Sequence, residues 1–108
     1  MIARLWSART TKASSTKYLE HFWQAVVPTL QKVEGYLGAT VLVRSHGDLV
    51  EILVTTTWKS FEAVDAFAGP DRGKAVVAPD AAAFLSDYDR HVRHYEVALL
   101  DGITFAKA

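Results

Sequence analysis

The hydrophobic pattern of this chain changes its period repeatedly, and the order of those periods constrains the fold more than any single motif. Four segments alternate apolar and polar residues as β-strands do, and two repeat at helical spacing. The predicted strands are 2–8, 39–44, 49–58 and 92–100, and the predicted helices are 16–33 and 61–68. This order, βαββαβ, predicts an α+β, ferredoxin-like fold, in which a four-stranded antiparallel sheet carries both helices on one face.

Turn and cap residues mark where these elements begin and end. Pro28 should kink or divide the first helix, because its ring clashes with the preceding turn. Ser60 is expected to cap the second helix, and Gly69-Pro70 to end it. Between the second helix and the last strand, residues 69–89 contain a short helix expected at 79–85. We predict that this segment covers the mouth of a pocket, since glycines and prolines interrupt it while a few apolar residues anchor it.

Length and charge narrow the possible functions. The 108 residues suit one domain, which we expect over residues 1–100, followed by a tail at 101–108. Twelve basic and twelve acidic residues cancel, so neither nucleic acid nor a membrane surface is an expected partner. The chain has no cysteine and no apolar run long enough to cross a bilayer. We therefore expect a cytoplasmic protein without a metal site.

One face of the predicted sheet remains uncovered by helices. It is expected to carry Trp6, Leu42 and Leu53, which together are too apolar to face water. A second copy of the chain is the simplest cover for such a face, and the absence of net charge leaves little repulsion against self-association. The sequence therefore predicts a homodimer.

Several segments resemble the antibiotic biosynthesis monooxygenase family. They are IARLW, YLEHFWQAVVPTLQKVEGYLG, LVTTTWKSFEAVDAFAG, AVVAPDAAAFLSDYD and VRHYEVAL. The resemblance implies a dimer whose two sheets form a barrel, with an apolar pocket between each sheet and its helices. Some members oxidise phenolic polyketides or quinols with dioxygen and no cofactor, and the deprotonated substrate supplies the electrons. Such chemistry needs a site that binds the substrate, stabilises its anion and excludes water.

Other relatives in this family bind and degrade haem. They use an asparagine on the first strand, a tryptophan on the second helix and a histidine shortly after it. The corresponding positions here are near Ser7, Phe67 and Val77, and all three residues differ. A valine cannot ligate iron, so haem degradation is not expected.

Two polar residues are candidates for catalysis. His94 could accept a proton near neutral pH, although a hydrogen-bonded histidine on a dimer-facing strand is the preferred interpretation. Arg4 is expected to share a sheet face with Glu51, His94 and Glu96. That group is interpreted as an ion-pair cluster inside the dimer, with a substrate anion site as the alternative. His91 and His94 are not a metal pair, because a spacing of three on a strand places them on opposite faces.

The candidate substrate-binding residues are mainly aromatic. Each aromatic residue has a core interpretation at least as well supported as a ligand contact, and for Trp58 the core role is preferred. The set is Ser7, Tyr18, Phe22, Trp58, Phe67, Phe84 and Tyr95. The first function hypothesis is a cofactor-independent monooxygenase acting on an aromatic, quinol-like or polyketide small molecule. The alternative is a non-catalytic, dimeric small-molecule-binding or stress-associated protein on the same scaffold.

Overall fold

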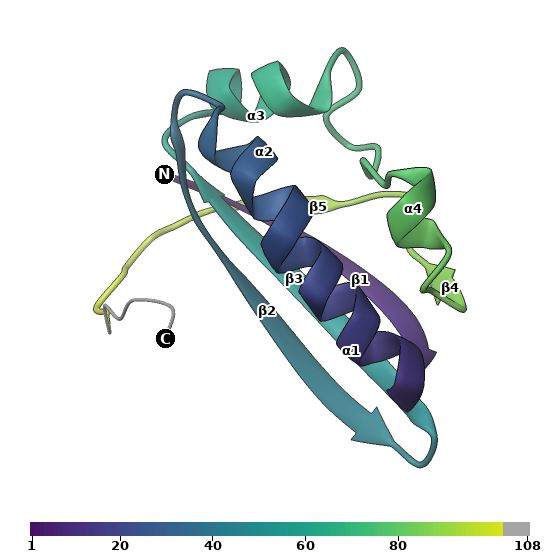
Figure 1. Cartoon of the computed structure of the whole chain (residues 1–108). Helices are drawn as coiled ribbons and strands as arrows, with labels where there is room; N and C mark the ends of the chain where they lie inside the picture. Colours follow the sequence, from purple (N-terminus) through teal and green to yellow (C-terminus); the bar gives the residue numbers. More distant parts are fainter. Residues whose placement is uncertain (103–108) are drawn as a thin grey trace.

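The computed structural model describes residues 1–102 as a sheet with its helices on one side (Figure 1). Its strands are β1 Ile2–Thr11, β2 Tyr36–His46, β3 Leu49–Trp58, β4 Asp87–Tyr88 and β5 Arg93–Glu96. Its helices are α1 Lys12–His21, a π-helical turn η1 Phe22–Val26, α2 Val27–Gln31, α3 Phe61–Ala68 and α4 Pro79–Ala82. All strand pairs are antiparallel, in the order β2-β3-β1-β4, and β5 also pairs with β1. The predicted ferredoxin-like α+β fold is confirmed.

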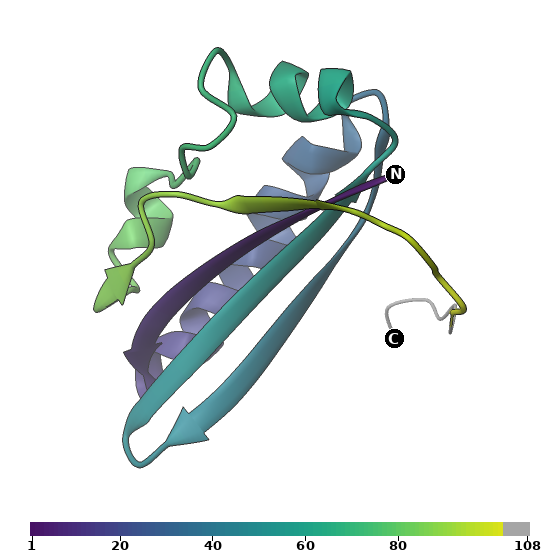
Figure 2. The same ribbon diagram turned by 180° about the vertical axis from the view of Figure 1, so that it is seen from behind.

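The sheet buries one face under the helices and leaves the other uncovered. In β3, Val50, Ile52, Val54, Thr56 and Trp58 are buried, while the residues between them are only partly covered. The continuous rod formed by α1, η1 and α2 lies across the buried face, as predicted from the alternation of β3 (Figure 1). Figure 2 looks onto the opposite face, which no helix covers.

The first helix begins earlier than predicted and accommodates its proline without a sharp break. It starts at Lys12, where the side chain of Thr11 accepts a hydrogen bond from the amide of Ser14 (3.2 Å). Before Pro28 the helix widens into η1, and the amide of Val27 donates to the carbonyl of Phe22, five residues earlier. A π-turn of this kind is a recognised way to relieve a local conflict within a helix. The predicted effect of Pro28, a kink or a division, takes the form of this π-helical turn, which separates α1 from α2 just before the proline.

The register corrects two sequence-based placements. Trp6 pairs with Val54 and so lies on the helix-covered face, not on the open face with Leu42 and Leu53. Glu51 pairs with Arg9 and lies on the open face, where it bonds Arg44 at 2.5 Å. Glu51 therefore cannot neighbour Arg4, which lies on the covered face.

The C-terminal third differs from prediction in detail. The last strand covers only Arg93–Glu96 of the predicted 92–100, and the two-residue β4 was not predicted. The short helix α4 ends at Ala82, three residues before the expected end. The predicted tail begins within the described residues, but 103–108 lie outside them. Of the helices described over 1–102, none is long and apolar enough to span a membrane.

The second predicted helix, α3, begins and ends as expected. The hydroxyl of Ser60 accepts from the amide of Ala63 at 3.3 Å, and Gly69 ends the helix with a φ of +82°. α3 packs closely on the turn before β2. A Cβ at Gly35 would lie 2.6 Å from the Cβ of Ala63, and Gly35 has a φ of +92°, so only glycine fits there.

Candidate functional site

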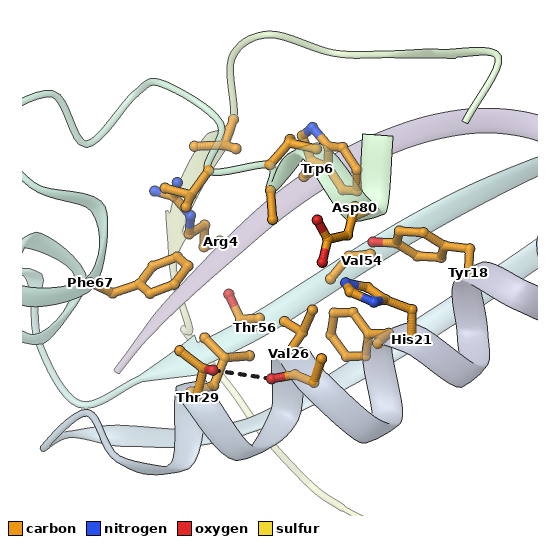
Figure 3. Close-up of a pocket in the computed structure, with 18 residues that line it drawn as sticks. Arg4, Trp6, Tyr18, His21, Val26, Thr29, Val54, Thr56, Phe67 and Asp80 are labelled. Atoms are coloured by element: carbon orange, nitrogen blue, oxygen red, sulfur yellow. Dashed lines mark hydrogen bonds between the residues drawn. The ribbon is translucent and has the colours of Figure 1, made fainter. Parts of the chain in front are cut away.

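A pocket of about 320 Å³ lies between the covered face of the sheet and the helical rod (Figure 3). β1 and β3 form its floor, the rod forms one wall, and α3 with residues 76–81 forms the rest. Its lining residues are Arg4, Trp6, Tyr18, His21, Phe22, Ala25, Val26, Thr29, Leu30, Val54, Thr56, Phe67, Val76, Val77, Ala78, Asp80, Ala81 and Val92. The volume is at the lower end of the range for small-molecule sites.

The deep part of the pocket combines apolar walls with three buried polar side chains. Arg4, Tyr18 and Thr56 are 5%, 4% and 7% exposed. Burial raises the pKa of Tyr18 to about 12, so its phenol stays protonated at neutral pH and can donate a hydrogen bond. Thr56 accepts from the indole Nε1 of Trp58 at 2.9 Å, which leaves its own O–H able to donate.

The rim of the pocket is more polar and more open. Ala25 and Thr29 border it from the rod, and Asp80 borders it from α4; all three are exposed. Figure 3 shows Asp80 and His21 both directed toward the pocket, at the end away from Phe67. The Oγ1 of Thr29 donates to the carbonyl of Ala25 at 3.0 Å, so that hydroxyl serves the widened helix.

Arg4 ties the sheet to the segment that follows α3. Its Nη1 donates to the carbonyl of Arg72 at 2.6 Å, and its Nη2 to the carbonyl of Lys74 at 3.0 Å. The guanidinium also lies 5.7 Å from the centre of the Phe67 ring. Burial lowers the pKa of Arg4. The same side chain thus anchors the predicted cover segment and lines the floor of the pocket.

His94 is positioned beside Arg4 and does not line the pocket. Its Nε2 lies 3.0 Å from Nη1 of Arg4. Because a guanidinium only donates hydrogen bonds, Nε2 must be the acceptor, which requires a neutral imidazole protonated on Nδ1. The pKa of His94 is lowered, first by burial and then by the charges of Arg4 and Arg72. Both facts describe His94 as a neutral acceptor that orients Arg4.

The structure brings four of the predicted site residues to this pocket, namely Arg4, Tyr18, Phe22 and Phe67. The other predicted residues lie elsewhere. Trp58 is fully buried in the core, where its ring stacks on Phe67 at 5.4 Å. Phe84 packs near His21 with ring centres 6.1 Å apart. Ser7 and Tyr95 pair with Leu53 and Ala3 on the open face.

Sequence reasoning missed four residues with chemical potential at the pocket: Trp6, His21, Thr56 and Asp80. Three of them carried a usable signal, and for Thr56 it is that the residue alternates in phase with Trp58 along β3. Trp6 alternates in phase with Arg4 along β1, and His21 follows Tyr18 by three residues on the helix, so each shares a face with a residue already singled out. Asp80 lies in the segment predicted to cover the pocket, but nothing in the pattern singled it out from the other residues of that segment.

Metal ligands are not grouped in this pocket. Over residues 1–102, no three His, Cys, Asp or Glu side chains are placed to hold a metal ion together. The expectation that the protein uses no metal or other cofactor stays a prediction.

The fold and pocket together define a ferredoxin-like α+β domain with a largely apolar pocket between its sheet and its helices. The family model for antibiotic biosynthesis monooxygenases matches residues 1–79. The chain therefore belongs to the antibiotic biosynthesis monooxygenase family, as its sequence motifs indicated. No curated protein matches the sequence at a significant level.

Solved structures with the same fold include three that illustrate its range. A putative antibiotic biosynthesis monooxygenase from Bacillus cereus is 19% identical over 97% of this chain and 98% of its own, with a TM-score of 0.64. The heme degrader MhuD from Mycobacterium tuberculosis, with two hemes bound, is 22% identical over 94% of this chain and 100% of its own, with a TM-score of 0.60. The ActVA-Orf6 monooxygenase from Streptomyces coelicolor, in complex with nanaomycin D, is 18% identical over 97% of this chain and 92% of its own, with a TM-score of 0.56.

Proposed function

We propose that this protein is a cofactor-independent monooxygenase that oxidises a planar aromatic, quinol-like or polyketide molecule with dioxygen. The observation that carries the proposal is the pocket itself, which is about 320 Å³ in volume and surrounded by aromatic and aliphatic side chains. A few hydrogen-bonding groups converge on its floor, where water is largely excluded. The family to which the chain belongs supports the same reaction class.

The proposed reaction balances without a cofactor. A phenol with a free ring position reacts with one dioxygen to give a quinone and one water. One oxygen atom becomes the new carbonyl and the other leaves as water, with the hydroxyl and ring C–H hydrogens. The substrate is oxidised and dioxygen is reduced, so no external reductant is needed. The protein must bind the planar ring, favour loss of its phenolic proton and exclude bulk water.

The chain's own residues suit those three tasks. Trp6, Phe22 and Phe67 supply flat or apolar surface for a ring. Tyr18 on the rod and Thr56 on the floor supply neutral hydrogen-bond donors. A non-catalytic ligand-binding protein would share the pocket and differ only in the absence of turnover.

We further propose that the working form is a cytoplasmic homodimer joined through the open face of the sheet. Leu42 and Leu53 lie directly opposite each other on that face, and Leu42 is 52% exposed. Tyr95, paired with Ala3, adds a second exposed apolar side chain at 51%. Burying such a surface is the usual driving force for association of a small domain.

Oxygen uptake with a panel of hydroxynaphthalenes and hydroxyanthrones tests the proposed activity. Turnover should consume one dioxygen per quinone formed, and ¹⁸O₂ should place one heavy atom in the product. Dialysis against a chelator should leave the rate unchanged. Binding of panel members without oxygen uptake above the protein-free rate supports the non-catalytic alternative and overturns the enzyme proposal.

A matched pair of variants tests whether the pocket is the place of reaction. Ala25 is exposed at the rim, so Ala25→Trp should narrow the mouth without disturbing the core. Gln24 is its exposed neighbour outside the lining, so Gln24→Trp is the control. We expect activity to fall at least about tenfold in the first variant and to persist in the second. Equal rates in both would place the reaction elsewhere.

A further inference from the structure

One wall of the pocket belongs to a segment that is attached to the sheet on either side of it. This wall contributes five lining residues, Val76, Val77, Ala78, Asp80 and Ala81. Within the described part of the chain, residues 76–81 hydrogen-bond only to their own segment. Their position therefore depends on the attachments before and after them. The later one is to β1, where the amide of Ser86 donates to the carbonyl of Arg9 at 2.8 Å.

The earlier attachment depends on Arg4, whose side chain is buried. Its guanidinium donates to the carbonyls of Arg72 and Lys74, at 2.6 and 3.0 Å. The side chain of Arg72 is held in turn by Asp65 of α3, through two hydrogen bonds of 2.8 and 2.7 Å. Two main-chain hydrogen bonds of 2.9 Å, to residues 90–92, complete the attachment. Arg4 thus joins β1, α3 and the start of the segment at one point.

His94 is the member of this group that can change its charge near neutral pH. Its Nε2 accepts from Nη1 of Arg4 at 3.0 Å, and its ring meets Phe61 at a steep angle, with ring centres 5.7 Å apart. A protonated imidazole has no acceptor, so the contact with Arg4 would become a repulsion between two cationic donors. Nη1 is also the atom that bonds the carbonyl of Arg72. Displacing Nη1 therefore disturbs the attachment of the segment as well.

The charged groups around His94 come from every element packed against it. They are Arg4 of β1, Glu62 and Asp65 of α3, Arg72 after α3, and Glu96 on the same face of β5. Burial, then Arg4 and then Arg72 lower the pKa of His94, and Asp65 opposes them. Asp65 already binds Arg72, so an imidazolium that attracted Asp65 would draw it away from Arg72. Either response to protonation loosens the same attachment.

We propose that Arg4 and His94 form a proton-sensitive latch on the pocket: the neutral imidazole keeps residues 72–74 bound to the sheet, and its protonation releases them so that the wall at 76–81 opens to exchange ligands. The latch is closed at neutral pH, because burial and two neighbouring cations keep His94 unprotonated there. It opens in mild acid, below the ordinary histidine pKa of 6.5. The inference concerns access to the pocket, so it applies to an enzyme and to a binding protein alike.

Hydrogen exchange measured by mass spectrometry tests the latch without a ligand. Wild type is compared with His94→Gln, which can accept from Arg4 but cannot take up a proton, and each comparison is made at one pH. At about pH 5.5 residues 71–78 should exchange at least about fivefold faster in the wild type, and at about pH 7.5 equally in both. The hairpin tip at 44–49 lies at the other end of β1 and should not differ. Faster exchange in 49–58 with no change in 71–78 overturns the latch, since the proton then acts only on global unfolding.

A neutral probe tests whether the latch controls access. N-phenyl-1-naphthylamine stays uncharged over this pH range and brightens in apolar surroundings, and Ala25→Trp identifies the signal that comes from the pocket. Its dissociation rate, measured by stopped flow, should rise at least about fivefold from about pH 7.5 to 5.5 in the wild type and stay nearly constant in His94→Gln. A constant wild-type rate overturns the proposal. So does a pH dependence that His94→Gln keeps and His21→Gln, at the pocket rim, removes. The exchange comparison decides alone if the probe does not bind the pocket.

The wild type alone provides a second measurement if His94→Gln does not fold. Nitrogen-15 NMR distinguishes the imidazole tautomers, and among the four histidines His94 should be neutral with its proton on Nδ1. Its titration midpoint should lie below 6.5 and coincide with the midpoint of the dissociation-rate profile. A rate profile that follows a different histidine overturns the latch.

Discussion

Nη1 of Arg4 lies 3.0 Å from Nε2 of His94, and the two residues face each other across neighbouring strands, in register. The contact works only while the imidazole is neutral, because protonation of Nε2 would set two donors and two positive charges against each other. Burial and the charges of Arg4 and Arg72 already lower the pKa of His94 below its usual 6.5. This relationship makes the stability of the domain depend on pH in a defined direction.

We predict that acidification below the ordinary histidine pKa destabilises the protein partly through His94. The unfolded chain takes up the proton near pH 6.5, whereas folded His94 resists it, so the free energy of unfolding falls as pH falls from 6.5. Below the pKa of folded His94 the free energy of unfolding no longer falls on account of this group. Above pH 6.5 His94 is neutral in both states and does not change the free energy of unfolding. The slope is at most about 1.4 kcal/mol per pH unit for one proton. The check is urea unfolding at several pH values for the wild type and for His94→Gln, which keeps an acceptor for Arg4. The free energy of unfolding should fall less steeply with decreasing pH in the variant than in the wild type.

Tyr18 gives a prediction at the opposite end of the pH scale. Its folded pKa of about 12 exceeds the ordinary value of 10.0. The contribution of Tyr18 to the free energy of unfolding is therefore fully present below pH 10 and is lost as the pH rises through 12. Two units correspond to about 2–3 kcal/mol. Ultraviolet titration should show one tyrosine ionising about two units late, and Tyr18→Phe should lack that phase. If every tyrosine of the wild type ionises near pH 10, the surroundings of Tyr18 are more open to water than the structure indicates.

The pattern of residues predicted the fold far better than the site. Alternation in β3 correctly predicted its buried face, and the order of elements predicted the topology, because both depend on local periodicity. In β1 the alternation placed Arg4 and Trp6 together, but both faces of that strand mix polar and apolar residues, so the pattern does not say which of them receives the helices. That single ambiguity assigned Trp6 to the open face. The segment 69–89 was predicted to cover the pocket, but which of its side chains reaches the rim, here Asp80 of α4, depends on how the segment folds back onto the sheet, and no local pattern records that.

Two aromatic substitutions should separate the core from the segment covering the pocket. Trp58 is fully buried and bonded to Thr56, so Trp58→Ala should cost about 3–5 kcal/mol in the free energy of unfolding. Phe84 is partly exposed and follows α4, so Phe84→Ala should cost less than about 3 kcal/mol. Hydrogen exchange should show faster exchange over residues 69–89 than in β1 and β3, and faster still in Phe84→Ala. Equal protection of this segment and the central strands would make it a fixed part of the core.

Leu42 and Val43 provide the sharpest test of the proposed dimer. They are neighbours on β2 with nearly the same exposure, 52% and 53%, but alternation directs Leu42 to the open face and Val43 to the face of Ile52. If two copies associate through the open face, Leu42→Lys buries a charge at the interface and should dissociate the dimer, whereas Val43→Lys should leave it intact. Sedimentation at micromolar concentration measures both. A wild type that is monomeric throughout, or a dimer disrupted by Val43→Lys and not by Leu42→Lys, would show that the open face is not the interface.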